Sequence, residues 1–322
     1  MNFAFTDEQL ALAATVRDVL RAHCPPGALR SERRPGWEQL AALGFFGLLL
    51  PPESDGLGLG LADVVPALEE TGRACLPGPV VETAVAAASL VAGVAKLASG
   101  AVCVSVLLPG QVYAPDADLA DLIVVAGADG LRLVTKESAR LTPRPGVDPC
   151  RPLFEVAFDP AGCERLGGPV EPALRRATVA TAAQLIGVAR ELLAVSVAYA
   201  RVRTQFGAAI GSFQAVKHQL ADVAVAVEFA APLVFRAALA VDGGIATVER
   251  DVSAAKAAAG EAATLAARVA LQVHGAVGYT EELDLRFWLA RAWSLSAAYG
   301  TTAAHRDRVR AAVLGGDVRR YP

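Results

Sequence analysis

The sequence predicts a mostly helical α+β fold with three parts in chain order: a helical region, a small β region and an antiparallel helical bundle. Apolar side chains recur at helical spacing over roughly the first 95 residues. Short β-rich runs separated by Gly and Pro follow between residues 101 and 158, and the helical period returns from Pro172 to Leu314. We place the domain boundaries at 1–97, 98–168 and 169–322.

The first region is expected to hold four helices. The first begins at Thr6-Asp7-Glu8, a typical start signal, and has an apolar face formed by Leu10, Leu12, Val16 and Leu20. A helix over Trp37–Leu43 ends at Gly44, and a long Pro- and Gly-rich turn follows. The last two helices are predicted from Asp63 to Thr71 and over Val80–Val94.

The β region is expected to contain three short strands, Val102–Leu107, Leu122–Val125 and Leu131–Val134. Turns are predicted at Pro109-Gly110, Gly127–Gly130 and Pro143–Gly146.

The third region is predicted to be a bundle of long helices. Its clearest apolar stripe has residues three and four apart, the spacing that buries one face of a helix: Phe213, Val216, Leu220, Val223 and Val227. Gly243-Gly244 and Gly275–Gly278 separate the long helices.

Composition excludes several classes of function. The 322 residues carry a formal charge of −3, so no global electrostatic case exists for binding nucleic acid. The five cysteines are scattered and never in C-x-x-C spacing, which disfavours zinc ligation and a disulfide framework. The N-terminus does not resemble a secretory signal, and apolar runs such as Ala84–Val94 are too short to span a bilayer. We expect a cytoplasmic protein without metal or membrane association.

The segment Arg203-Thr204-Gln205-Phe206-Gly207 lies between two predicted helices. Arg203 has the geometry to bind an anionic group through two hydrogen bonds, and Phe206 is able to cover an aromatic ring. Ordinary structural roles fit as well, because an arginine at a helix C-terminus complements the helix dipole.

A second segment runs from Gln272 to Glu281. Gln272 continues a stripe with Leu265 and Val269, so its amide is expected at the end of an apolar face, where it needs a partner. His274 has no second ligand at helical spacing and is interpreted as a packed histidine.

Together these segments closely resemble the signature of the acyl-CoA dehydrogenase family, over residues 201–222 and 272–282. The N-terminal region is similar to that family's helical domain, with Trp37–Gly58 and Glu69–Arg73 carrying the likeness. The resemblance implies an acyl-CoA dehydrogenase-like fold with helical and β domains followed by an antiparallel four-helix bundle.

The resemblance also implies FAD as cofactor. Residues matching Arg203, Phe206, Gln272 and Gly275 contact an FAD bound mainly to a neighbouring subunit in the family. The second glycine of the family's pair is Ala276 here, which crowds the approach of the backbone. Thr301 matches a residue that binds the chain's own FAD.

Two departures concern the chain's own site. The family's base is a glutamate before Gly-Thr, but Tyr299 occupies that slot, and no glutamate follows Glu282. Alignment on Arg291 moves the slot to Gly300, which is no acid either. A tyrosine needs a large fall in pKa to act as a base at neutral pH.

Other members place the glutamate on the first long C-terminal helix, where Pro172–Arg190 contains no acid and Glu191 comes too late to match. The β domain is also shortened and lacks the family's Thr-Glu-Pro-x-x-Gly-Ser and Trp-x-Ser/Thr segments. The resemblance therefore implies that this chain lacks the flavin-ring and acyl half of a site.

These retentions and losses predict a half-site subunit of an α2β2 acyl-CoA dehydrogenase. Its partner chain would supply the catalytic glutamate and bind the acyl-CoA, and an electron-transfer flavoprotein or similar acceptor would receive the electrons. Some actinobacterial enzymes that act on steroid or other bulky acyl-CoA thioesters resemble this arrangement. A homo-oligomeric flavoenzyme with altered chemistry at Tyr299 and a flavin-free helical scaffold are the alternatives.

Overall fold

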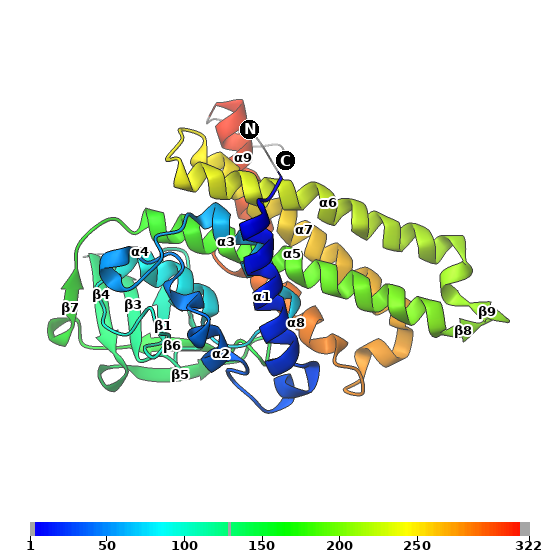
Figure 1. The fold of residues 1–322 in the computed structure, drawn as a ribbon, viewed down its shortest axis with the longest axis horizontal. Helices are drawn as coiled ribbons and strands as arrows, with labels where there is room; N and C mark the ends of the chain where they lie inside the picture. Colours follow the sequence, from blue (N-terminus) through cyan, green and yellow to red (C-terminus); the bar gives the residue numbers. More distant parts are fainter. Residues whose placement is uncertain (1–3, 128–129, 316–322) are drawn as a thin grey trace, which may run out of the picture.

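The computed structural model describes residues 4–127 and 130–315 and has the predicted mostly helical α+β architecture. Three long helices run side by side through the molecule: α5 (Glu171–Val202), α6 (Gln214–Asp242) and α7 (Val248–His274). The β-sheets lie at one end of these helices, and a small hairpin of β8 (Thr204–Gln205) and β9 (Ala208–Ala209) lies at the other (Figure 1).

The N-terminal helices are α1 (Asp7–His23), α2 (Trp37–Ala42), α3 (Leu61–Arg73) and α4 (Ala87–Leu90). Helix α1 begins as predicted, because the Thr6 hydroxyl and the Gln9 side chain cap each other's backbone N–H groups. Helix α3 starts two residues earlier than Asp63, whose carboxylate instead accepts a hydrogen bond from the Gly60 N–H.

The helix predicted over Val80–Val94 is shorter than expected. It ends at Leu90, and its first part is a π-helical turn, η4 (Glu82–Ala86). Such turns are rare and often mark functional positions.

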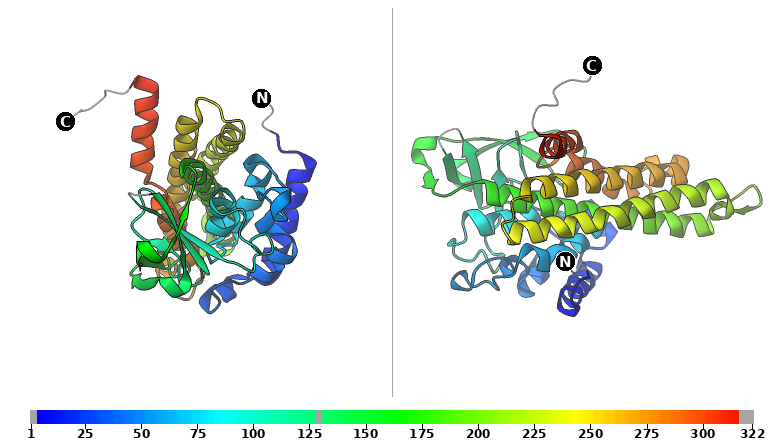
Figure 2. Two further views of the ribbon diagram at one scale, coloured as in Figure 1. Left: turned by 90° about the vertical axis from the view of Figure 1, so that its left-hand side faces the viewer. Right: turned by 90° about the horizontal axis from the view of Figure 1, so that it is seen from above.

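Helix α3 crosses α5 at very short range. A Cβ atom built on Gly187 would lie 1.9 Å from the Glu69 carbonyl oxygen, and one on Gly72 would lie 2.1 Å from that of Gln184. Glycine at both crossing positions therefore allows the N-terminal helices to dock directly on the bundle (Figure 2).

The β region forms two small sheets. The first has the order β1-β3-β4-β7 and the second β2-β6-β5. The strands are β1 (Val104–Leu107), β2 (Ala114–Pro115), β3 (Leu122–Gly127), β4 (Gly130–Thr135), β5 (Arg140–Arg144), β6 (Leu153–Ala157) and β7 (Glu164–Leu166).

Strands β1, β3 and β4 are those that the sequence predicts, whereas β2, β5, β6 and β7 are additional. The turn predicted at Pro143–Gly146 is wrong at its first two residues, because Pro143 and Arg144 belong to β5 and pair with β6. Strand β5 lies at the edge of its sheet, where a residue without an N–H is tolerated.

The bundle is completed by α8 (Leu285–Ala297) and α9 (Thr302–Leu314). A continuous hydrophobic core joins it to the N-terminal helices and to β1 and β3. Within the predicted stripe of α6, Val223 and Val227 are buried but Phe213 is exposed, because the start of α6 projects beyond that core (Figure 1).

Helix α6 is also long and apolar enough to cross a membrane by length and composition. The core helix of a soluble protein passes the same test, and α6 packs against α5 and α7.

Candidate functional site

The loop that follows α8 holds Tyr299 in a left-handed conformation, with φ at 55°. This region of φ is unfavourable for a bulky residue and persists only where the surrounding structure imposes it. The position that lacks the family's carboxylate is therefore a strained one.

Two buried side chains, those of Lys256 and His305, contact backbone carbonyls of this loop. The Lys256 ammonium group donates hydrogen bonds to the carbonyls of Ser296 and Gly300, each at 3.1 Å. His305 Nε2 lies 3.1 Å from the Tyr299 carbonyl oxygen. Burial lowers the pKa of Lys256 to about 7 and that of His305 to about 4, and the Lys256 charge adds to the second shift. A neutral His305 is thus favoured at physiological pH, with Nε2–H as the donor.

The Tyr299 side chain is held by the carboxylate of Glu82. Its hydroxyl donates a hydrogen bond to Glu82 Oε1 at 2.7 Å, and the Arg151 guanidinium lies 3.5 Å from the same carboxylate oxygen. Burial, reinforced by the negative charge of Glu82, raises the pKa of Tyr299 well above its ordinary value. This shift is opposite to the one that a tyrosine base requires.

A pocket of about 330 Å³ opens in front of this cluster. Its walls come from the β1–β2 loop, the segment before β6 and the end of α8, and they include Gln111, Tyr113, Arg151, Trp293 and Tyr299. The sequence predicts the position of the family's base in this loop, which makes the pocket the candidate for the chain's own site.

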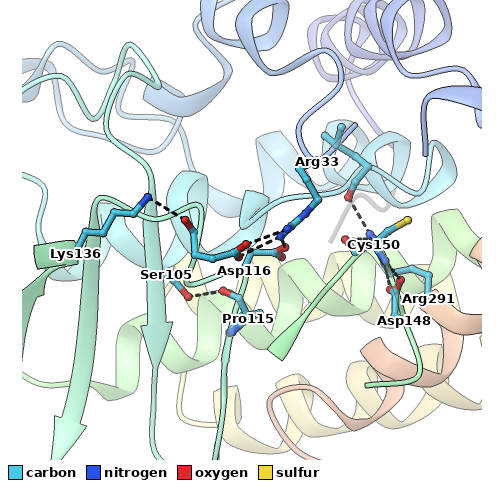
Figure 3. A network of polar contacts seen from close by, with 10 residues as sticks. Arg33, Ser105, Pro115, Asp116, Lys136, Asp148, Cys150 and Arg291 are labelled. Atoms are coloured by element: carbon cyan, nitrogen blue, oxygen red, sulfur yellow. Dashed lines mark hydrogen bonds and ion pairs between the residues drawn. The ribbon is translucent and has the colours of Figure 1, made fainter. Parts of the chain in front are cut away.

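A network of buried charges lies beside the pocket (Figure 3). Arg291, on α8, pairs with Asp148 and donates to the Leu76 and Cys150 carbonyls, which ties the bundle to both preceding regions. Asp116 lies 3.4 Å from Arg33, and burial raises its pKa to about 7. The network therefore joins all three parts of the chain.

Arg203 and Phe206 lie at the opposite end of the molecule, in and beside the β8–β9 hairpin (Figure 1). Phe206 is 93% exposed and has a φ of 53°. Arg203 is also exposed, and no ion pair joins it to any residue of the described chain. Both side chains are free to contact a molecule outside this chain.

Gln272, Gly275 and Ala276 lie at the end of α7 and in the turn η8 (Gly275–Tyr279). The expectation that Gln272 ends a buried stripe is wrong for the isolated chain, because its side chain is exposed. Gly275 has φ 62° and ψ −142°, a conformation that only glycine adopts readily.

These two segments lie at the same end of the bundle. The Tyr199 ring, one turn before Arg203, stacks on His274 with the ring centroids 4.4 Å apart. His274 is buried, and its Nδ1 lies 2.8 Å from the Ala270 carbonyl oxygen, so it packs between helices. The stacking places five of the six predicted FAD-contact residues, all but Thr301, at one end of the molecule.

Thr301 lies elsewhere, at the start of α9, where its hydroxyl accepts a hydrogen bond from the Ala304 N–H. Glu191 forms an ion pair with Arg73 at 3.0 Å and does not line the pocket beside Tyr299.

Sequence reasoning missed Glu82, Arg151 and Lys256. Glu82 and Lys256 carry a recognisable signal, because each is a charge set within an apolar or Ala-rich helical run. Arg151 lies in an irregular segment, where no periodicity points to its burial.

Comparison with known proteins finds two matching domains in this chain. The N-terminal domain of acyl-CoA dehydrogenases matches residues 6–102, and the C-terminal domain matches residues 170–314. The chain belongs to the acyl-CoA dehydrogenase family. Members of this family are FAD-binding oxidoreductases that act on acyl-CoA.

Among its relatives, the acyl-CoA dehydrogenase IpdE2 of Mycobacterium tuberculosis is 32% identical over 89% of this chain and 91% of that protein. A variant of the steroid ACAD Tcur3481–Tcur3483 superposes with a TM-score of 0.85 at 24% identity, over 96% of this chain and 98% of the other. The ChsE4–ChsE5 complex of M. tuberculosis superposes with a TM-score of 0.85 at 23% identity, over 99% of this chain and 100% of the other. The two structures share the fold of this acyl-CoA dehydrogenase.

Proposed function

We propose that this chain is the half-site subunit of a heteromeric FAD-dependent acyl-CoA dehydrogenase. The complex removes the α-proton and the β-hydride of an acyl-CoA thioester, and a partner chain supplies the catalytic glutamate. The observation that carries this proposal is the contrast between the two ends of the molecule. At one end, the side chains of Arg203, Phe206 and Gln272 are exposed to solvent. At the other end, the loop of the chain's own site carries the buried Tyr299.

The outward end fits a flavin bound mainly to another subunit. The unpaired Arg203 guanidinium suits a pyrophosphate, and the exposed Phe206 ring suits the adenosine. Gln272 presents an exposed amide, and Gly275 keeps its backbone clear, since no atom lies within 4 Å of a Cβ built there. FAD, when bound, accepts the hydride; these residues bind and orient it.

The chain's own site is poorly suited to proton abstraction. Tyr299 is buried with a raised pKa, and Glu191 is engaged with Arg73 away from the pocket. The alternative of an enzyme that uses Tyr299 as its base is therefore disfavoured.

The relatives support the remaining parts of the proposal. The Tcur3481–Tcur3483 protein is described as a steroid ACAD. Its name and that of the ChsE4–ChsE5 complex each contain two components. We further propose an α2β2 assembly, a steroid or other bulky acyl-CoA as substrate, an electron-transfer flavoprotein as acceptor and a cytoplasmic location. The domain division at 1–97, 98–168 and 169–322 belongs to the same proposal, as does Thr301 as a contact to any FAD bound on this chain.

The test is to co-express the chain with its catalytic partner and to count flavin per chain. We expect one FAD per two unlike chains. Arg203→Ala is expected to weaken FAD binding by roughly ten- to a hundredfold, the size of a lost charge-assisted hydrogen bond. Arg203→Lys, which keeps the charge without the planar fork, should be intermediate.

Arg140→Ala is the matched control, because Arg140 is an exposed arginine on β5 at the other end of the molecule. It should leave flavin content unchanged. Stoichiometric FAD and dehydrogenation by this chain alone would contradict the half-site role, and complexes without any flavin would favour the scaffold.

A further inference from the structure

Tyr299, Glu82 and Arg151 come from three separate parts of the chain. Tyr299 follows α8, Glu82 lies in the π-helical turn η4, and Arg151 lies just before β6. The contact between the Tyr299 hydroxyl and Glu82 spans 217 residues of sequence. We call these three residues the Tyr299 latch.

Two cavities of very different size lie against the Tyr299 latch. The outer pocket of about 330 Å³ has Tyr299 and Arg151 in its wall and no residue of the N-terminal helices. The inner cavity, lined by Glu82, Arg151, Thr181 and Gln184 among others, measures only about 10 Å³. That volume holds about one water molecule, so an acyl chain has no room beyond the latch.

Hydrogen bonds hold the strained residue of the latch through both its backbone and its side chain. The backbone of Tyr299 is fixed by His305, the flanking carbonyls by Lys256, and the side chain by Glu82. All three latch residues are at most 9% exposed, so solvent competes little for these contacts.

We propose that the Tyr299 latch fastens the loop after α8 to the N-terminal helices and keeps the acyl chain of a thioester from entering beyond the outer pocket, so that this chain's own site binds no thioester. This inference rests on the proposed half-site function and explains how the unused site is kept shut. Tyr299 stands where the sequence predicts the family's base, and its side chain forms part of the wall of the outer pocket.

Hydrogen exchange in the complex with the partner chain tests the latch. Tyr299→Phe removes only the hydroxyl, so the ring still fills its place. We expect amide exchange to rise about fivefold or more both in residues 296–302 and in residues 80–86, because each segment loses the same contact. Tyr113→Phe, on the outer wall of the same pocket, is the control and should change neither segment.

A rise confined to residues 296–302, or no rise, would overturn the latch. Closure has its own measurement: native mass spectrometry of the wild-type complex with octanoyl-CoA. At most one thioester per pair of unlike chains is expected, whereas two per pair would show that the pocket is open. The exchange readout does not depend on flavin, so a complex without FAD would refute the half-site function and leave the latch to be judged separately.

Discussion

At the scale of the single residue, Lys256 is a buried cation that holds the loop after α8. Its side chain is fully buried, and its ammonium group contacts two carbonyls and, within the described chain, no carboxylate. Burying a cation without an opposite charge favours its neutral form, which is why burial lowers its pKa to about 7. In this buried position the Lys256 side chain makes the hydrogen bonds to the Ser296 and Gly300 carbonyls that hold the loop.

The lowered pKa predicts a pH dependence of stability. Between about pH 7 and 10 the unfolded chain binds a proton at Lys256 and the folded chain does not, so this residue makes stability rise with pH. The slope for one group is at most about 1.4 kcal/mol per pH unit. Lys256→Met should abolish this contribution, so the unfolding free energy of the wild type minus that of the variant should increase from pH 7 to 9.

Lys136→Met is the control, because it removes the same kind of side chain from an exposed position. Denaturant unfolding at several pH values measures both differences. A flat difference for Lys256→Met would mean that the buried amine keeps its ordinary pKa.

At the scale of the element, the crossing of α3 and α5 positions Glu82 and the other N-terminal residues against the bundle. The crossing is close only because Gly72 and Gly187 lack side chains. A single extra methyl group at this contact must push two helices apart.

We therefore predict that Gly187→Ala destabilises the protein by roughly 1–3 kcal/mol, the usual cost of overpacking. Alanine favours an isolated helix by about 1 kcal/mol over glycine, so a loss of stability isolates the packing effect. Gly162→Ala is the control, because no atom lies within 4 Å of a Cβ built there. Thermal unfolding measures both variants, and equal melting temperatures would mean that the crossing relaxes at little cost.

At the scale of the whole molecule, the spacing of apolar residues and the positions of Gly and Pro are enough to predict the order of helical, β and helical regions. Local signals such as the Thr6 cap work because both partners are close in sequence. Tertiary contacts are not predictable in this way. Pro143 reads as a turn residue but pairs at a sheet edge, and Glu82 meets Tyr299 only after the chain has folded. The spacing of Gln272 predicts a buried stripe, yet its side chain is exposed while its neighbours Val273 and His274 are buried.

The bundle also leaves an apolar face uncovered. A groove of about 790 Å³ runs between α6, α7 and α9, and its wall includes Phe229, Leu233 and Leu265. Phe229 is 76% exposed, and Val225, on the same helix, is also exposed. Contiguous apolar surface of this kind usually marks a protein interface. The proposed assembly with a partner chain gives this face something to pack against.

Phe229→Asp is accordingly predicted to break the assembly while leaving the fold intact. A carboxylate in a dry interface loses its hydration without gaining a partner, a cost of several kcal/mol that is enough to shift the complex to separate chains at micromolar concentration. Because Phe229 contributes little to the core of the chain itself, its circular dichroism and melting should change little. Leu10→Asp, at a half-exposed position on α1, should leave the assembly intact. Light scattering coupled to size-exclusion chromatography measures the mass of each variant co-expressed with the partner. An unchanged mass for Phe229→Asp would place the interface on another face, and the hairpin end that carries Arg203 and Phe206 would then be the surface to mutate next.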